Sequence, residues 1–258
     1  MTDRRILVRR PSPQLADGQV SHIERSAVDV DLAGRQWEAY VDAFRSAGWS
    51  VIELPELDEH PDGVFVEDAV FVFRDVAVVA RSGAESRRGE TAGLAERFAD
   101  LGYDVTTIEA PATLDGGDLL KVGDTVYAGR SARTNPEGIA QLRAAIEPRG
   151  ATVVEVPVTK ALHLKSCLTA LPDGTIVGHE PVVDEPGMFD RIEMTPEESG
   201  AHVVDLGDGR ILLASSCPQS ADAHRRHGVE VVTVDIGEFE KLEGCVTCLS
   251  VRLHDGVD

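Results

Sequence analysis

The sequence predicts an α/β fold in which five similar units are arranged radially around a shared axis. The main observation is a recurring pattern: a helical stretch ends at a glycine and a run rich in β-branched residues follows, at 48–55, 102–111, 150–157, 200–206 and 228–236. Glycine suits the left-handed residue that ends many helices. The first four glycines are spaced by 54, 48 and 50 residues and the last by only 28, so the repetition is approximate.

Hairpins accompany these runs and are the second observation. Turn signals at Gly123-Asp124, Asp173-Gly174 and Asp208-Gly209 stand where two strands must reverse. A single unit of this kind cannot bury its sheet face alone, whereas a radial arrangement buries all five and brings their polar loops to the centre. The alternative, a doubly wound parallel sheet, predicts crossover helices after single strands rather than after hairpins. We expect one domain that spans residues 1–258.

Helices are predicted between the strands. The first has apolar residues at i, i+3, i+4 and i+7, namely Trp37, Tyr40, Val41 and Phe44. A shorter stripe follows at Leu94, Phe98 and Leu101. A third helix begins with a capping residue, Asn135, and a proline in its first turn, and it carries Ile139, Leu142 and Ile146 on one face. Each helix therefore buries one stripe.

Charge and composition exclude several classes of protein. With 25 basic and 45 acidic residues the formal net charge is -20, which excludes a nucleic-acid binder and favours a small cationic ligand. With 42% hydrophobic residues the chain suits a globular protein with a large core. It has neither an apolar run of about 18 to 20 residues nor a secretory signal within residues 1–10, so we expect a cytoplasmic protein without a membrane partner.

Acidic residues stand in unusual places in two of the loops. Glu67 and Asp68 interrupt an apolar run from Val64 to Phe73, with Asp62 just before it. Adjacent acids in a buried strand are costly unless they meet positive charge. They indicate a cradle for a guanidinium or a metal, although a solvent-facing pair at a strand end is the alternative. The second motif, Asp115-Gly116-Gly117-Asp118, is read either as an ordinary turn or as part of a site.

Nucleophiles and bases are few. His163 lies between two leucines, a setting typical of a core histidine, and Cys245 and Cys248 form a CxxC pair. Four cysteines in so long a chain do not indicate a disulfide scaffold. The CxxC spacing is compatible with a zinc half-site or a redox pair, but no matching second pair exists and a strand pattern follows, so structural cysteines are favoured. Arg87, Arg88 and Arg133 precede helices and would suit a ligand carboxylate.

Taken together and in this order, five motifs resemble the dimethylarginine dimethylaminohydrolase family of the pentein superfamily. They are Phe65-Val-Glu-Asp, Leu114-Asp-Gly-Gly-Asp, Arg133-Thr-Asn, Leu162-His-Leu-Lys-Ser and Thr247-Cys248. The resemblance covers the chain from about Leu7 to Leu253. It implies a fivefold pseudosymmetric α/β propeller of ββαβ-type units, the pentein fold. It also implies hydrolysis of Nω-methylated arginines to citrulline and a methylamine, without a cofactor or metal.

The resemblance also implies roles for individual residues. Cys248 resembles the nucleophile, His163 the general acid and base, and Asp115 the carboxylate that orients the histidine. Glu67 and Asp68 resemble the pair that binds the guanidinium, and Asp62 the acid that meets the α-amino group. The arginines near the substrate carboxylate correspond to Arg87 and Arg133, with Arg88 as a substitute for Arg87. Further substrate contacts correspond to Phe65, Leu242 and Glu24, where relatives carry an apolar residue in place of the glutamate.

Nearby acids lead us to expect a resting Cys248 thiol that is largely protonated, because they disfavour a second negative charge. Two other functions remain open at this stage. One is hydrolysis of arginine itself or of another guanidine, as in arginine deiminases, although these carry an inserted helical segment that is absent here. The other is a thiol redox or zinc protein built on Cys245 and Cys248. A homodimer is also left open.

Overall fold

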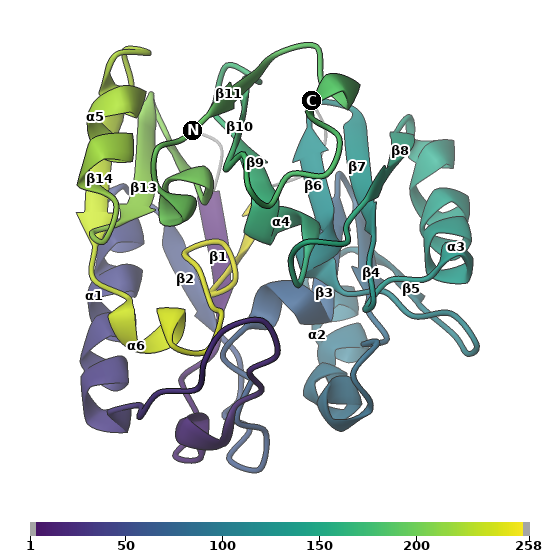
Figure 1. Cartoon of the computed structure of the whole chain (residues 1–258). Helices are drawn as coiled ribbons and strands as arrows, with labels where there is room; N and C mark the ends of the chain where they lie inside the picture. Colours follow the sequence, from purple (N-terminus) through teal and green to yellow (C-terminus); the bar gives the residue numbers. More distant parts are fainter. Residues whose placement is uncertain (1–3, 255–258) are drawn as a thin grey trace.

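The computed structural model of the protein describes residues 4–254, which form five three-stranded sheets arranged around a centre (Figure 1). In every sheet the middle strand pairs antiparallel with one neighbour and parallel with the other. This is the fivefold pseudosymmetric α/β propeller of ββαβ-type units, and the predicted radial arrangement is confirmed.

Four sheets are built from consecutive segments of chain. The first contains β3 (Val70–Phe73), β4 (Val76–Val79) and β5 (Asp104–Thr107), and the second β6 (Leu119–Val122), β7 (Thr125–Arg130) and β8 (Thr152–Pro157). The third contains β9 (Leu168–Ala170), β10 (Ile176–Gly178) and β11 (Ile192–Met194). The fourth contains β12 (Val204–Gly207), β13 (Arg210–Ala214) and β14 (Glu230–Val234). The three turn signals all lie between the strands of these hairpins.

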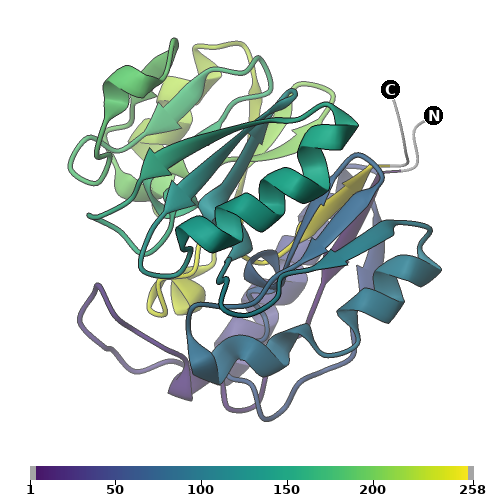
Figure 2. The same cartoon turned by 90° about the vertical axis from the view of Figure 1, so that its right-hand side faces the viewer.

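The fifth sheet joins the two ends of the chain. It contains β15 (Val251–His254), β1 (Arg4–Val8) and β2 (Ser50–Glu53), with β1 in the middle. Arg4 pairs with His254 and Leu7 with Val251 in the antiparallel register. The first and last described strands therefore close the ring (Figure 2).

Helices connect the parallel strands of four sheets. They are α1 (Val30–Ser46), α2 (Leu94–Asp100), α3 (Pro136–Ile146) and α5 (Pro218–Arg225). The predicted stripe of α1 is fully buried, and the side chain of Asn135 caps α3 by accepting from the Gly138 N–H at 2.8 Å. Two single turns complete the helices, α4 (Leu164–Cys167) and α6 (Gly237–Glu240). No described helix is long and apolar enough to cross a bilayer.

One repeat is placed differently from the sequence prediction. The run at 200–206 contains the first strand of a hairpin, β12, and not the strand that follows a helix. The strand that does close the preceding sheet is β11, which has only three residues and is reached through a single 3-10 turn, Pro186–Met188. Without a full helix and its terminal glycine, this unit lacks the signal on which the prediction was based.

The apolar core is divided among the units. Buried side chains form five clusters, each between a helix or loop and the neighbouring sheets. The largest one packs α1 against β14 and the segment that carries Val246 and Leu249. Tyr40 of α1 donates its hydroxyl to the Val246 carbonyl at 2.8 Å. The segment around Cys248 is therefore held by the core rather than by surface contacts.

Candidate active site

His163 lies at the start of α4, where its ring is buried between two carboxylates. Its Nε2 lies 3.1 Å from Asp115 Oδ2 and its Nδ1 lies 3.8 Å from Asp68 Oδ1. Burial alone lowers the pKa of His163, but the charge of Asp68, the hydrogen bond with Asp115 and the charge of Asp118 outweigh it and raise the pKa to about 9. The imidazole is therefore protonated at neutral pH; its Nε2–H donates to Asp115, and its Nδ1–H faces Asp68 as an ion pair.

Asp68 and Arg87 extend this network. Arg87 donates to Asp68 Oδ2 at 2.7 Å and makes a two-pronged contact with Glu90 at 2.9 and 2.8 Å. Burial disfavours the charged form of Asp68, yet His163 and Arg87 lower its pKa to about 2. The backbone N–H of Gly117 also donates to Asp68 at 3.0 Å. Asp68 is thus a fixed anion, and Arg87 is fully engaged by two carboxylates.

Arg133 and Asp62 meet through a residue of the N-terminal segment. Arg133 contacts Asp115 Oδ2 at 3.3 Å and donates to the Gln19 amide oxygen at 3.1 Å. The Gln19 backbone N–H donates to both oxygens of Asp62 at 3.1 and 3.2 Å, and its side chain reaches Ser86. Gln19 therefore connects a cation and an anion that lie on different units of the propeller.

Cys248 is partly exposed and lies beside the acidic pair. Its carbonyl accepts the Glu67 N–H at 3.2 Å, and its Sγ lies 3.1 Å from Cys245 Sγ. The contact with Cys245, burial, and the negative charges of Glu67 and Asp68 hold the pKa of the Cys248 thiol well above its usual value. A largely protonated resting thiol is the state that the sequence predicts.

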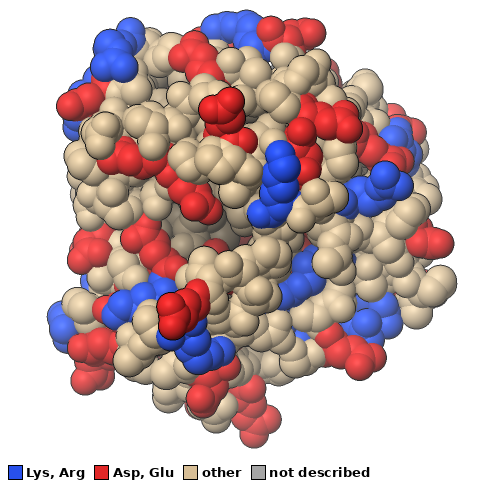
Figure 3. All heavy atoms as spheres, viewed as in Figure 1, with Lys and Arg blue, Asp and Glu red and all other residues tan. Residues whose placement is uncertain are grey.

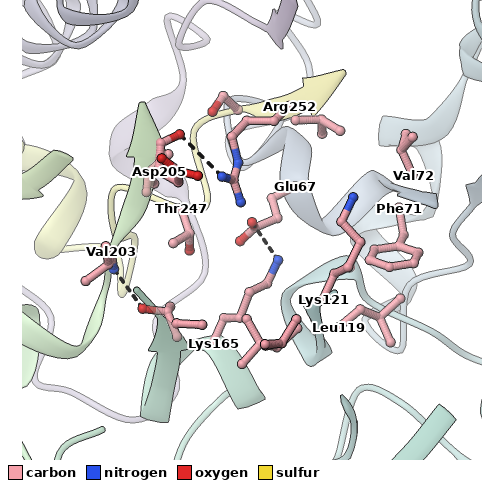
Figure 4. A pocket seen from close by; sticks show the side chains of 18 of the residues that line it. Glu67, Phe71, Val72, Leu119, Lys121, Lys165, Val203, Asp205, Thr247 and Arg252 are labelled. Atoms are coloured by element: carbon pink, nitrogen blue, oxygen red, sulfur yellow. Dashed lines mark hydrogen bonds and ion pairs between the residues drawn. The ribbon is translucent and has the colours of Figure 1, made fainter. Parts of the chain in front are cut away.

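Glu67 lines a cavity at the centre of the propeller. Its Oε1 pairs with Lys165 Nζ at 2.6 Å (Figure 4), whereas its buried Oε2 has no hydrogen-bond partner among the described residues. The cavity has a volume of about 290 Å³, and its lining includes Lys121, Thr247 and Arg252 besides the Glu67–Lys165 pair. An unsatisfied buried carboxylate oxygen is costly, so Oε2 is available to a cationic donor.

Local backbone structure differs from the prediction at the acidic pair. Glu67 and Asp68 lie on a 3-10 turn, Val66–Ala69, ahead of β3, rather than inside a buried strand. A second 3-10 turn, Gly116–Asp118, packs against it. A Cβ on Gly116 would lie 2.0 Å from the Glu67 carbonyl, and one on Gly117 would lie 2.8 Å from His163 Nδ1. The two glycines of the Asp-Gly-Gly-Asp motif allow this close approach.

Phe65, Leu242 and Glu24 complete the predicted set. Phe65 and Leu242 are buried in the core cluster that also contacts Cys248, and the Phe65 ring packs edge-on against Phe239 at 6.4 Å. Glu24 is exposed and makes no hydrogen bond to the described part of the chain. Just before it, the backbone N–H groups of Ser21, His22 and Ile23 donate to the Glu243 carboxylate. The structure thus does not bring the Glu24 side chain to the cluster.

Three residues of the site were given no role from the sequence: Gln19, Glu90 and Lys165, of which Lys165 lies within a quoted motif. Lys165, two residues after His163, and Glu90, three residues after Arg87, had only a weak signal in their spacing.

The ligand atoms of Asp68, Asp115 and His163 lie within 4.8 Å of one another, as a metal site requires. Arg87 and Arg133 already occupy oxygens of both carboxylates, so the cluster is compensated by protein cations.

Acidic side chains border a hollow on the face seen in Figure 3. Carboxylates around a cleft attract cationic ligands. The site thus combines a thiol, a protonated imidazole and several carboxylates, a set suited to nucleophilic attack on a cationic carbon.

Comparison with known proteins places this chain in a family of hydrolases. A model of eukaryotic N,N dimethylarginine dimethylhydrolase matches residues 19–210. An N(G),N(G)-dimethylarginine dimethylaminohydrolase of Streptomyces coelicolor is 59% identical over the whole of both chains. One from Pseudomonas aeruginosa is 36% identical, over 96% of this chain and 99% of its own. The chain belongs to the dimethylarginine dimethylaminohydrolase family and is a hydrolase, as its motifs predicted.

Solved structures agree with this assignment. A cysteine-to-serine variant of the Pseudomonas aeruginosa enzyme complexed with citrulline has a TM-score of 0.92 and 34% identity, over 98% of this chain and all of its own. A histidine-to-glycine variant of a dimethylarginine dimethylaminohydrolase, in an adduct with S-methyl-L-thiocitrulline, has a TM-score of 0.91 with the same identity and coverage. The N-terminal domain of the cyanobacterial arginine dihydrolase ArgZ, with 20% identity and a TM-score of 0.86, shares the fold.

Proposed function

We propose that the protein hydrolyses asymmetric dimethylarginine and monomethylarginine to citrulline and dimethylamine or methylamine, through a covalent intermediate on Cys248. Family membership supports the reaction class. The observation that carries the proposal is the continuous buried network from Asp115 through His163 and Asp68 to Arg87, next to the Cys248 segment and the unsatisfied Glu67 Oε2.

Binding of the substrate is the first step. Its planar guanidinium would donate to Glu67 and Asp68, and its α-amino group would meet Asp62. Arg133 would meet the α-carboxylate, because it is partly exposed and is held by two contacts of 3.3 and 3.1 Å. For Arg87 to bind the α-carboxylate as well, it would have to break its contact with Glu90 or Asp68. Arg88, which donates to Ser82 and Glu85, is the alternative arginine for this contact. Phe65 and Leu242 would cover the apolar stem.

The bound cation then activates the thiol. By offsetting the charges of Glu67 and Asp68, it lowers the pKa of Cys248, and the thiol proton leaves to solvent. The thiolate attacks the guanidinium carbon and forms a C–S bond. His163, held protonated by its two carboxylates, gives its proton to the departing amine as the C–N bond breaks, which leaves a cationic thiouronium on Cys248.

Hydrolysis of the intermediate returns the enzyme to its starting state. The now neutral His163 takes a proton from water, and the hydroxide adds to the thiouronium carbon. Collapse of this adduct breaks the C–S bond and releases citrulline, a thiolate and one proton, which the amine product takes up. The thiolate then takes back from solvent the proton that it lost on substrate binding, which restores the resting thiol. Asp115 would hold the imidazole in one orientation throughout.

Substitution of the nucleophile and the base tests this mechanism. Cys248→Ser is expected to abolish turnover, and His163→Gly to stall it, with intact-protein mass spectrometry reporting whether the stall comes before or after covalent capture. Turnover by Cys248→Ala comparable to that of the unmodified enzyme would contradict the assignment.

A comparison of substrates tests the specificity. Arginine, monomethylarginine, asymmetric dimethylarginine and agmatine are assayed side by side for citrulline or carbamoyl product and released amine. The methylated arginines are expected to have the highest kcat/KM. Preference for unmethylated arginine would instead favour a deiminase-like function.

A further inference from the structure

Cys245 and Cys248 are placed so that one disulfide would join them without a change of fold. Their sulfur atoms are 3.1 Å apart, and the Cys248 N–H donates to the Cys245 carbonyl at 3.1 Å. A hydrogen bond of this kind closes a β-turn, in which the end Cα atoms lie within about 7 Å. Disulfides require a Cα separation of about 4.4 to 6.8 Å, a range that a hydrogen-bonded β-turn can provide.

The two sulfurs differ in access. Cys248 is partly exposed, whereas Cys245 is buried behind it and is held by Thr247 Oγ1 at 3.1 Å. A small oxidant therefore meets Cys248 first, and Cys245 is the nearest group able to react with the product. The other two cysteines lack this arrangement: Cys167 and Cys217 are buried, each directed at a backbone carbonyl, with thiol pKa values raised to about 12 by burial.

We propose that Cys245 and Cys248 form an oxidation site, at which hydrogen peroxide converts the proposed nucleophile into a reversible disulfide with its neighbour. Cys248 first loses its thiol proton and then attacks one peroxide oxygen as the thiolate; the O–O bond breaks and hydroxide leaves, so that Cys248 becomes a sulfenic acid. The Cys245 thiolate then attacks the sulfenic sulfur, the S–O bond breaks and hydroxide leaves; the protons lost by the two thiols convert both hydroxides to water. The two electrons lost by the sulfurs reduce the peroxide.

This site gives the hydrolase a protected inactive form. A disulfide removes the nucleophile but is restored by thiols, whereas a sulfenic acid without a partner proceeds in excess peroxide to a sulfinic acid that thiols do not reduce. The loss of activity rests on the proposed role of Cys248 in catalysis. Formation of the disulfide between Cys245 and Cys248 does not depend on that role.

The test compares the unmodified protein, Cys245→Ser and Cys217→Ser as a matched buried-cysteine control. Each is treated with excess hydrogen peroxide, assayed with dimethylarginine, then reduced with dithiothreitol and assayed again. Free thiols are alkylated before digestion, and the peptides are mapped by mass spectrometry. All three are expected to have similar activity before treatment.

The unmodified protein and Cys217→Ser are expected to lose activity, to contain a 245–248 disulfide, and to regain most of their activity on reduction. Cys245→Ser is expected to lose activity with less than a tenth regained, and to contain sulfinic acid at position 248. Equal recovery by Cys245→Ser, or sulfinic acid without the disulfide in the unmodified protein, would overturn the proposal. If Cys245→Ser does not fold, Cys245→Ala replaces it and the peptide map of the unmodified protein still decides.

The peptide map also separates the two hypotheses. A disulfide at 245–248 in a protein that does not turn over methylated arginines would leave the oxidation site intact and refute the proposed function. Turnover of methylated arginines without formation of the disulfide would support the proposed function and refute the oxidation site.

Discussion

His163 owes its chemistry to its neighbours rather than to its residue type. A histidine between two leucines is typical of a core position, and burial alone would keep it neutral. Asp68, Asp115 and Asp118 reverse this and raise its pKa to about 9. An acid able to protonate an amine at neutral pH thus arises from three carboxylates in a chain that has 45 acidic residues.

Asp115→Asn tests the contribution of one of these carboxylates. The amide retains the shape but loses the charge, so the pKa of His163 is expected to fall by about 1 unit, at the low end of the effect of one nearby opposite charge. A titration of the histidine Cε1–H signals by NMR measures this pKa directly. The basic limb of the kcat profile should move to lower pH by the same amount, and Glu56→Gln, on an exposed loop, should leave both unchanged.

The shifted pKa of His163 also makes the stability of the fold depend on pH. Because the pKa of His163 is higher in the folded protein, its protonation stabilises the fold fully below the unfolded value of about 6.5. This contribution is lost as the pH rises through about 9. In Asp115→Asn, the loss should be smaller and occur at lower pH in urea unfolding curves. A pKa that does not move would show that Asp115 does not set the charge of the imidazole.

At the scale of elements, short 3-10 turns position the polar groups while the regular helices supply the core. The turn Gly116–Asp118 packs against the turn Val66–Ala69, and together they bring Asp68 and His163 into contact. The apolar stripe of α1 was predicted correctly from its spacing, because helix periodicity is repeated over many residues. A turn of only four residues has no period, so the placement of Glu67 and Asp68 on Val66–Ala69 was not predictable in this way.

A pair of glycine substitutions separates these two kinds of element. Gly117→Ala would place a methyl group 2.6 Å from Asp68 Oδ1 and 2.8 Å from His163 Nδ1, so kcat/KM should fall by at least tenfold. Gly34→Ala, in the interior of α1 with nothing within 4 Å of the added carbon, should raise the unfolding free energy by about 0.5 to 1 kcal/mol and leave kcat/KM unchanged. Steady-state kinetics and urea unfolding measure both. Full activity in Gly117→Ala would show that the turn tolerates movement away from the imidazole.

At the scale of the whole molecule, the sequence predicted the pseudosymmetric arrangement better than it predicted the contacts between units. Four of the five glycine-led runs contain the strand that follows a helix, and the fifth, at 200–206, was misplaced because its neighbouring unit has a 3-10 turn instead of a helix. Contacts between units depend on the assembled ring. Gln19 reaches Asp62 and Arg133 across 43 and 114 residues of chain, and no local pattern marks such a residue.

Ring closure by β1 and β15 predicts that the native ends can be joined. A circular permutant with a short linker between the native termini and new ends after Gly187, in an exposed turn, should keep the far-ultraviolet circular dichroism and most of the activity. A linear chain that lacks residues 251–258 serves as the comparison and should lose cooperative thermal unfolding. A folded, active truncated chain would show that the fifth sheet does not need its last strand.

Ring closure also bears on the surroundings of the proposed nucleophile. Cys248 precedes β15 by three residues, and β15 pairs with β1. The segment that carries Cys248 is thus tied on its C-terminal side to the first described strand, so loss of this pairing is expected to displace the sulfur.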